Sequence, residues 1–174
     1  MILTHAFGNF VPKDMRYLIL GSFTAKSLDI DPGYTWFYSS KKNQFWGIIE
    51  QVYSVSLSNK NSRVNFLSKL RIGISDIIYQ CERAKENSSD NNLINVIYNP
   101  KLRPIISGNN IETIFFTSHF VENKFRRHYK DLILTYPNIL LVTLPSPSPR
   151  YALMTKEEKV KIYKHLLPKQ IATC

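Results

Sequence analysis

Three short runs of apolar residues limit the fold more than any other feature of this 174-residue sequence. They occupy residues 17–20, 113–116 and 139–144, and they stop at Gly, at Thr-Ser and at Pro, respectively. Near-continuous hydrophobicity of this kind is typical of parallel strands that are buried on both faces. A weaker fourth candidate spans residues 74–79, just after Gly73. These runs predict a short central sheet of four mostly parallel strands.

Helical patterns separate the runs. Apolar side chains recur at three- and four-residue spacing over residues 44–53, 64–70, 119–129 and 156–167, which predicts helices there. Strands that alternate with helices favour right-handed crossovers and a sheet covered on both faces. We therefore expect a three-layer α/β/α fold, built as a single domain over residues 1–174.

Two polar stretches are expected to face solvent. Residues 83–92 are rich in Ser and Asn, which is typical of a mobile loop. Lysines lie off the apolar face of the last predicted helix, at Lys156, Lys159, Lys161 and Lys164. Such a run is usually a solvated face, so it predicts no specific contact.

The charge of the chain indicates a polyanionic partner. Lys and Arg number 23 against 13 Asp and Glu, for a formal charge of +10 and a pI near 9.6, so nucleic acid is favoured over a membrane surface. No apolar run approaches the roughly 20 residues of a membrane helix, and no signal peptide is visible. Cys81 and Cys174 form no disulfide framework, and the four histidines lack metal-ligand spacing. We expect a cytoplasmic protein without metal or cofactor.

A proline-rich segment follows the last predicted strand. It consists of Pro145, Ser146, Pro147, Ser148, Pro149 and Arg150, named here the Pro–Ser loop. Each proline fixes φ and removes a donor, so the segment is stiff before anything binds. It is either a rigid turn or a wedge that enters a DNA groove while its hydroxyl and amide groups take phosphates. In an open α/β sheet, ligands bind beyond the carboxyl ends of the strands, where this loop is expected.

Aromatic residues gather over residues 34–46, together with Lys41 and Lys42. Aromatic side chains beside basic ones suit base stacking with phosphate neutralisation, but they also suit a core. Asn43 stands where an N-cap of the following helix is expected. Residues 21–24 lack the spacing of a dinucleotide-binding turn, and no phosphate-binding loop of the Walker type occurs.

In colinear order, these segments resemble the uracil-DNA glycosylase superfamily, and within it the branch of mismatch-specific and hypoxanthine-DNA glycosylases. The matching residues are His5, Phe7, 18–23, Phe37, Tyr38, 43–46, 73–74, 76–77, 81–83, 114–116 and 144–149. The resemblance implies an uracil-DNA glycosylase-like fold and cleavage of the bond between a flipped, deaminated base and its sugar.

The resemblance also implies roles for single residues. Asn43 would position the attacking water, with Asp76 as a second candidate that is equally well explained as a helix cap or buried turn. Phe37 or Tyr38 would stack on the base, Phe23 would line the site, and the Pro–Ser loop would intercalate. Thr117 and Ser118 stand where that branch commonly has Asn-Gly, and they would contact the edge of the base.

The leading hypothesis is thus a monomeric, monofunctional DNA glycosylase of base-excision repair, acting on uracil or hypoxanthine, including G:U or G:T mismatches. The main alternative is a non-catalytic nucleic-acid-binding protein on the same fold. A small-molecule hydrolase that uses the same crevice is a third, weaker reading. Strand cleavage after alkali separates the first two.

Overall fold

The computed structural model describes residues 1–24, 35–85 and 89–169. Its centre is a four-stranded sheet in the order β3-β2-β6-β7, in which every neighbouring pair is parallel. The strands are β2 (Tyr17–Gly21), β3 (Ile72–Asp76), β6 (Thr113–Phe116) and β7 (Leu140–Thr143). The predicted parallel sheet is confirmed, and the three strongest apolar runs became β2, β6 and β7.

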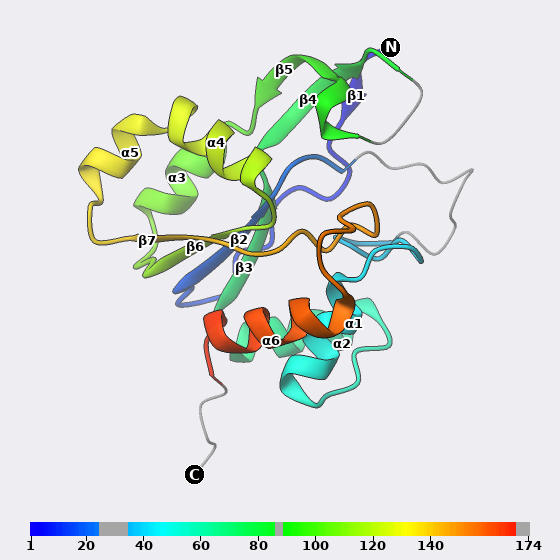
Figure 1. The fold of residues 1–174 in the computed structure, drawn as a ribbon. Helices are drawn as coiled ribbons and strands as arrows, with labels where there is room; N and C mark the ends of the chain where they lie inside the picture. Colours follow the sequence, from blue (N-terminus) through cyan, green and yellow to red (C-terminus); the bar gives the residue numbers. More distant parts are fainter. Residues whose placement is uncertain (25–34, 86–88, 170–174) are drawn as a thin grey trace.

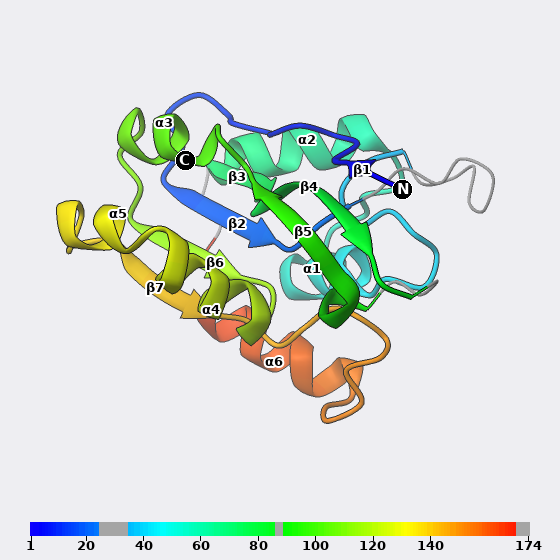
Figure 2. The same cartoon turned by 90° about the horizontal axis from the view of Figure 1, so that it is seen from above.

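Helices cover both faces of this sheet (Figure 1). One layer contains α1 (Phe45–Tyr53), α2 (Lys60–Lys69) and α6 (Lys156–Leu166), and the other contains α3 (Leu102–Ser107), α4 (His119–His128) and α5 (Lys130–Thr135). Figure 2 shows α4 and α6 on opposite sides of the sheet. The three-layer α/β/α prediction is confirmed, whereas the short helices α3 and α5 had no clear periodicity in the sequence.

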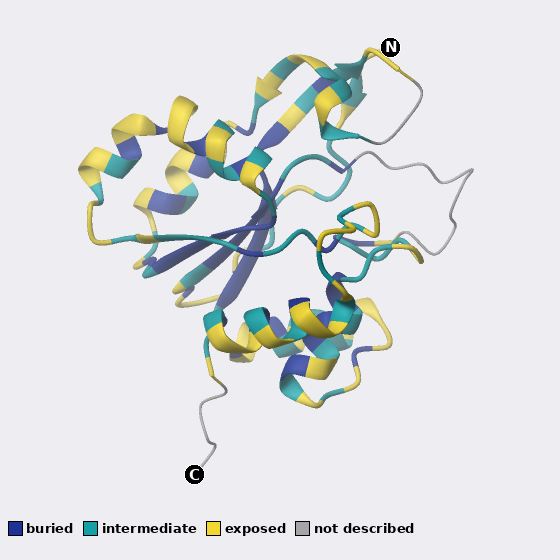
Figure 3. Ribbon diagram, viewed as in Figure 1, coloured by how far each residue is buried: buried dark blue, intermediate teal, exposed yellow. Residues whose placement is uncertain are grey.

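Side chains along β2 and β6 point alternately to the two faces of the sheet, and each face has its own hydrophobic core. Ile19 and Phe115 face the layer of α1, α2 and α6, while Leu18 and Phe116 face α3, α4 and α5. Successive strand residues point to opposite faces, so a strand buried on both must be apolar throughout. Figure 3 shows β2, β3 and β6 as the buried centre of the molecule.

A second, antiparallel sheet was not predicted. Its strands are β1 (Leu3–Thr4), β4 (Ile78–Arg83) and β5 (Leu93–Tyr98), in the order β1-β4-β5. The single strand expected over residues 74–79 is therefore wrong: β3 ends at Asp76, and β4 starts in the other sheet two residues later. Apolar residues resume at Ile77 directly after Ser75 and Asp76, so the two strands read as one run in the sequence.

The polar stretch over residues 83–92 is only partly a loop. Arg83 is the last residue of β4, and η1 (Asp90–Asn92) is a short 3-10 helix leading into β5. Residues 86–88 of the expected mobile loop lie outside the described residues. The aromatic segment likewise begins, at Tyr34, outside them.

The lysines of α6 do not all face solvent. Lys161 and Lys164 are exposed, as expected, but Lys159 is only 1% exposed. The expectation of a solvated face is wrong for Lys159 because it precedes the buried Tyr163 by four residues and so shares its side of the helix. The helix starts with a capping box formed by Thr155 and Glu158.

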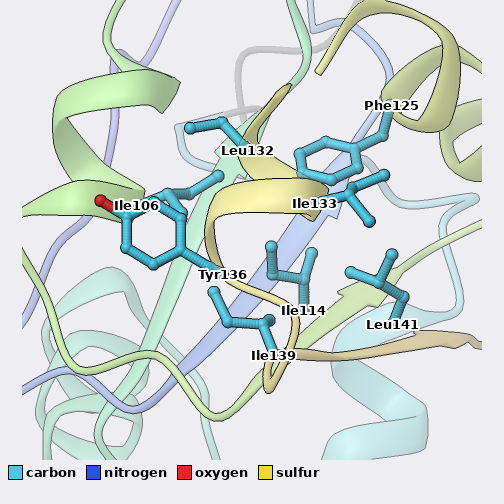
Figure 4. A pocket seen from close by; sticks show the side chains of 8 residues that line it. All are labelled: Ile106, Ile114, Phe125, Leu132, Ile133, Tyr136, Ile139 and Leu141. Carbon is cyan, nitrogen blue, oxygen red and sulfur yellow. The ribbon is translucent and has the colours of Figure 1, made fainter. Parts of the chain in front are cut away.

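The pocket drawn in Figure 4 lies within the α3–α4–α5 layer, where this layer meets β6 and β7. Its lining is apolar and aromatic: Ile106, Ile114, Phe125, Leu132, Ile133, Tyr136, Ile139 and Leu141. Ile114 and Leu141 stand near the amino ends of their strands, so the pocket lies away from the carboxyl ends. No helix among the described residues is long and apolar enough to cross a membrane.

Candidate active site

The four parallel strands end at one edge of the central sheet. The register pairs Gly21 with Asp76 across β2 and β3, and Phe116 with Thr143 across β6 and β7. Backbone hydrogen bonds extend this edge, from the Thr117 amide to the Leu20 carbonyl at 3.1 Å. The segments that follow the strands are therefore neighbours, as predicted for an open α/β sheet.

A buried histidine–carboxylate pair occupies this edge. Nε2 of His5 lies 2.8 Å from Oδ2 of Asp76, and the two side chains are 5% and 2% exposed. The Phe7 amide donates to Nδ1 of His5 at 3.3 Å. That contact assigns the imidazole proton to Nε2, which then donates to the Asp76 carboxylate.

The amino-terminal strand brings His5 to the site. β1 pairs with β4, and the His5 amide donates to the Tyr79 carbonyl at 2.8 Å. Aromatic rings surround the imidazole: the ring centroids of Phe7, Phe23 and Phe37 lie 6.5, 6.2 and 5.6 Å from that of His5. An apolar surrounding of this kind strengthens the hydrogen bond between His5 and the Asp76 carboxylate.

Gly21 allows Asp76 and Tyr38 to approach the backbone of β2. A Cβ atom at position 21 would collide with Oδ1 of Asp76 and with the hydroxyl oxygen of Tyr38. Tyr38 has a φ of 56°, in the left-handed region that non-glycine residues rarely adopt. Its ring stacks on Phe45, with centroids 4.4 Å apart. Strained residues of this kind concentrate at binding and catalytic sites.

The side chain of Asn43 binds the first amide of the helix that follows it. Oδ1 of Asn43 accepts a hydrogen bond of 2.9 Å from the Phe45 amide, and α1 begins at Phe45. The N-cap residue of α1 is Gln44, which makes no side-chain cap bond, so Asn43 satisfies one amide at the helix start from the position before the N-cap. The side-chain nitrogen of Asn43 makes no hydrogen bond to any residue that the structure describes.

The other residues assigned to base recognition differ in exposure. Phe37 is 0% exposed and belongs to the core, so its ring has no face open to a base. Phe23 and Tyr38 are half-buried. Thr117 is buried and bonded to β2, while the Ser118 hydroxyl accepts from the Val121 amide and caps α4. Thr117 and Ser118 therefore both make hydrogen bonds within the protein, whether or not they also contact a base.

The Pro–Ser loop stands beside the segment that leads into α1 (Figure 1). The Pro147 carbonyl accepts from the Gln44 amide at 3.0 Å. Internal bonds make the loop compact: the Ser148 and Arg150 amides donate to the hydroxyls of Ser146 and Ser148. The two serine hydroxyls are therefore engaged within the loop.

The loop exposes only part of its length. Pro147 is buried, Pro145, Ser146 and Ser148 are half-buried, and Pro149 and Arg150 are exposed. Leu153, three residues further on, is 83% exposed, which is high for an apolar side chain. Lys41 and Lys42 are also exposed, in the segment leading into α1. Within the loop, only Pro149 and Arg150 are therefore fully open to solvent, and Leu153 follows them as an exposed apolar side chain.

The sequence missed a second carboxylate. Oδ1 of Asp90, in η1, accepts a hydrogen bond of 2.8 Å from the Ser22 hydroxyl, one residue beyond β2. Burial raises the pKa of Asp90 above its ordinary value, against the lowering effect of the Ser22 bond. The charge of Asp76 raises this pKa further, and Arg83 and Arg150 lower it. Asp90 is thus held beside the end of β2 by its bond to Ser22.

No cluster of metal ligands accompanies these carboxylates: across residues 1–24, 35–85 and 89–169, His, Cys, Asp and Glu form no group of three suited to a metal ion. The pair of His5 and Asp76 is a two-residue arrangement.

Comparison with protein-family models and with curated proteins gave no match. Among solved structures, the chain is similar to a putative uracil DNA glycosylase from Methanosarcina acetivorans, determined by solution NMR. The similarity covers 95% of this chain and 99% of that one, with a TM-score of 0.66 and 21% identity. The two proteins share a fold. The uracil-DNA glycosylase-like fold implied by the sequence motifs is thereby confirmed.

Proposed function

We propose that the chain is a DNA glycosylase that hydrolyses the N-glycosidic bond of a flipped, deaminated base in base-excision repair. The observation that carries the proposal is the convergence of the Asp76–His5 pair, Tyr38 and the Pro–Ser loop at one edge of the sheet. The fold shared with the Methanosarcina protein supports the same reaction, and the charge of +10 supports DNA as the partner.

The site offers what this reaction needs. The departing base leaves a positively charged, oxocarbenium-like sugar, which a fixed negative charge stabilises. Asp76 supplies that charge, and its oxygen Oδ1 is directed at Gly21 rather than at His5. A carboxylate also accepts a proton from water, which an amide cannot do. Asn43 caps α1 through its oxygen and orients the water through its side-chain nitrogen.

The substrate base is uracil or hypoxanthine, in a paired or mismatched duplex. Tyr38 and Phe23 are the rings that would stack on it, since both retain exposed surface. Phe37 supports Tyr38 from the core, with ring centroids 6.5 Å apart. Thr117 and Ser118 follow β6 and would read the edge of the base through their hydroxyls.

The exposed end of the Pro–Ser loop opens the duplex in this proposal. Pro149 and Leu153 are the apolar groups that would enter a base step, and Arg150 would hold a phosphate or the vacated space. Lys41 and Lys42 neutralise the DNA backbone beside the base pocket.

A panel of duplexes that differ only in one base tests the proposal. The substrates carry uracil or hypoxanthine opposite each normal base, or thymine opposite guanine, and are treated with alkali after incubation. Breaks at the modified base support a glycosylase. Salt-sensitive binding without breaks supports the alternative of a non-catalytic binding protein, which gains weight from the capping roles of Asn43 and Ser118.

A further inference from the structure

Lys159 is an unusual residue for a helix of this charge. It is 1% exposed, whereas lysine is almost never fully buried unless it is paired. Burial lowers the pKa of its ammonium group. No acidic side chain among the described residues forms an ion pair with it. Its burial must therefore be offset by other contacts.

Those contacts all lead to the Pro–Ser loop or to the start of α1. Nζ of Lys159 donates to the Ser148 carbonyl at 3.3 Å and to Oε1 of Gln44 at 2.9 Å. It also lies 5.4 Å from the centre of the Tyr151 ring, just beyond the loop. One ammonium group thus joins α6, the loop and the residue that precedes α1.

Two further bonds fix the same arrangement. The Tyr163 hydroxyl, one turn further along α6, donates to the Pro145 carbonyl at 2.8 Å. The Gln44 amide donates to the Pro147 carbonyl at 3.0 Å. The loop is therefore held at three carbonyls, and Gln44 directly follows Asn43 in the chain.

We propose that Lys159 is a positioning residue that locks the Pro–Ser loop against the start of α1, so that the loop can unstack a base pair while Asn43 stays aligned. The inference rests on the proposed function. Unstacking requires a loop that does not yield when it enters the duplex, because a flexible loop moves aside instead. Prolines stiffen the loop locally, and Lys159 fixes it to the body of the protein.

The Lys159→Met substitution tests this inference on two substrates. Met is unbranched and only one atom shorter than Lys, so it removes the buried charge and leaves most of the space filled. Excision from a fully paired duplex should fall about tenfold or more. Excision of the same base placed opposite an abasic site should be nearly unchanged, because an unpaired base needs little unstacking. An equal loss on both substrates, or no loss on either, would overturn the inference.

Two companion variants sharpen the test. Lys164→Met makes the same charge change at an exposed position of α6 and should leave both rates unchanged. Tyr163→Phe removes only the hydroxyl that holds Pro145 and should show a weaker form of the same selective loss. A loss in Lys164→Met as large as that in Lys159→Met would assign the effect to net charge and overturn the inference.

Hydrogen exchange of the Gln44 amide gives a readout that does not depend on activity. This amide is bonded to the Pro147 carbonyl, so a released loop exposes it to solvent. Exchange at Gln44 should be faster in Lys159→Met than in the wild type and unchanged in Lys164→Met. If the wild type excises no base, the proposed function fails, and this measurement alone decides whether Lys159 holds the loop. Unchanged exchange at Gln44 would overturn the inference.

Discussion

Nε2 of His5 and Oδ2 of Asp76 lie 2.8 Å apart although 71 positions separate the two residues in the chain. The bond joins the residue that follows β1 in one sheet to the last residue of β3 in the other. It leaves Oδ1 of Asp76 directed at Gly21. The proposed chemistry depends on this orientation of the carboxylate, so Asp76 is the first residue to change.

Asp76→Asn should abolish most of the excision while the protein stays folded. The amide has the size of the carboxylate and still accepts the hydrogen bond from His5, but it has neither the charge nor the basicity. We expect the single-turnover rate to fall by about a hundredfold or more, as is typical for loss of a general base. DNA affinity should be retained. Excision at the wild-type rate would exclude Asp76 from the chemistry.

Asn43 has two roles that one substitution pair separates. Asn43→Ala removes the cap of the Phe45 amide and should lower the free energy of unfolding by about 1 kcal/mol. Asn43→Asp keeps a capping oxygen at the helix start, so stability should be maintained. If the side-chain nitrogen orients water, both variants lose excision. Full activity of Asn43→Asp, measured beside its melting temperature, would leave Asn43 with only a capping role.

The fold was largely predictable because three of the four strands in the central sheet carry their own signal. β2 and β6 are apolar runs that are buried on both faces, and the apolar run of β7 forms a partly buried strand at the edge of the sheet. The colinear motifs likewise indicated which strand ends would meet. The apolar runs and the motifs are both short stretches of neighbouring residues, so they can be recognised from composition and spacing alone.

The contacts that complete the site could not be predicted in this way. Asp90 reaches Ser22 across 68 positions, from a stretch that reads as a polar loop. Lys159 shares the buried side of α6 with Tyr163, but its bond to the Ser148 carbonyl depends on the Pro–Ser loop, and helical periodicity says nothing about a loop. The burial of Phe37 depends on neighbours from several elements, so an aromatic cluster alone did not separate core from stacking surface.

Arg150 should contribute to DNA binding through a phosphate. Arg150→Ala should weaken binding to all sequences and reduce the slope of log affinity against log salt by about one. Lys42→Ala should reduce the slope in the same way if the segment before α1 lies along the DNA backbone. Lys69→Ala is the matched control, because Lys69 is exposed but lies before β3, at the opposite edge of the sheet. A slope unchanged in Arg150→Ala would remove this end of the loop from the DNA interface.

Asp90 should make stability depend on pH in the acid range. Because burial raises its pKa in the folded protein, the folded state favours the protonated form. The stabilisation is therefore fully present below the unfolded pKa, about 3.9, and is lost as pH rises through the raised folded value. Asp90→Asn removes this dependence.

Denaturant unfolding of the wild type and of Asp90→Asn, measured from pH 3 upward, shows in which direction Asp90 changes stability with pH. The free energy of unfolding of the wild type should fall relative to that of the variant as pH rises. Ser22→Ala removes the bond that favours the charged carboxylate, so the same fall should extend to higher pH. A wild type that gains stability over Asp90→Asn across this range would contradict the assignment.

The most direct measurement is the detection of free base released from a duplex before any alkali is added. Wild-type protein is incubated with duplexes that contain uracil or hypoxanthine, and the products are separated by mass. We predict that free uracil or hypoxanthine appears together with an unbroken strand that carries an abasic site, and that Asp76→Asn releases almost none. Wild-type protein that binds these duplexes and releases neither base would contradict the account.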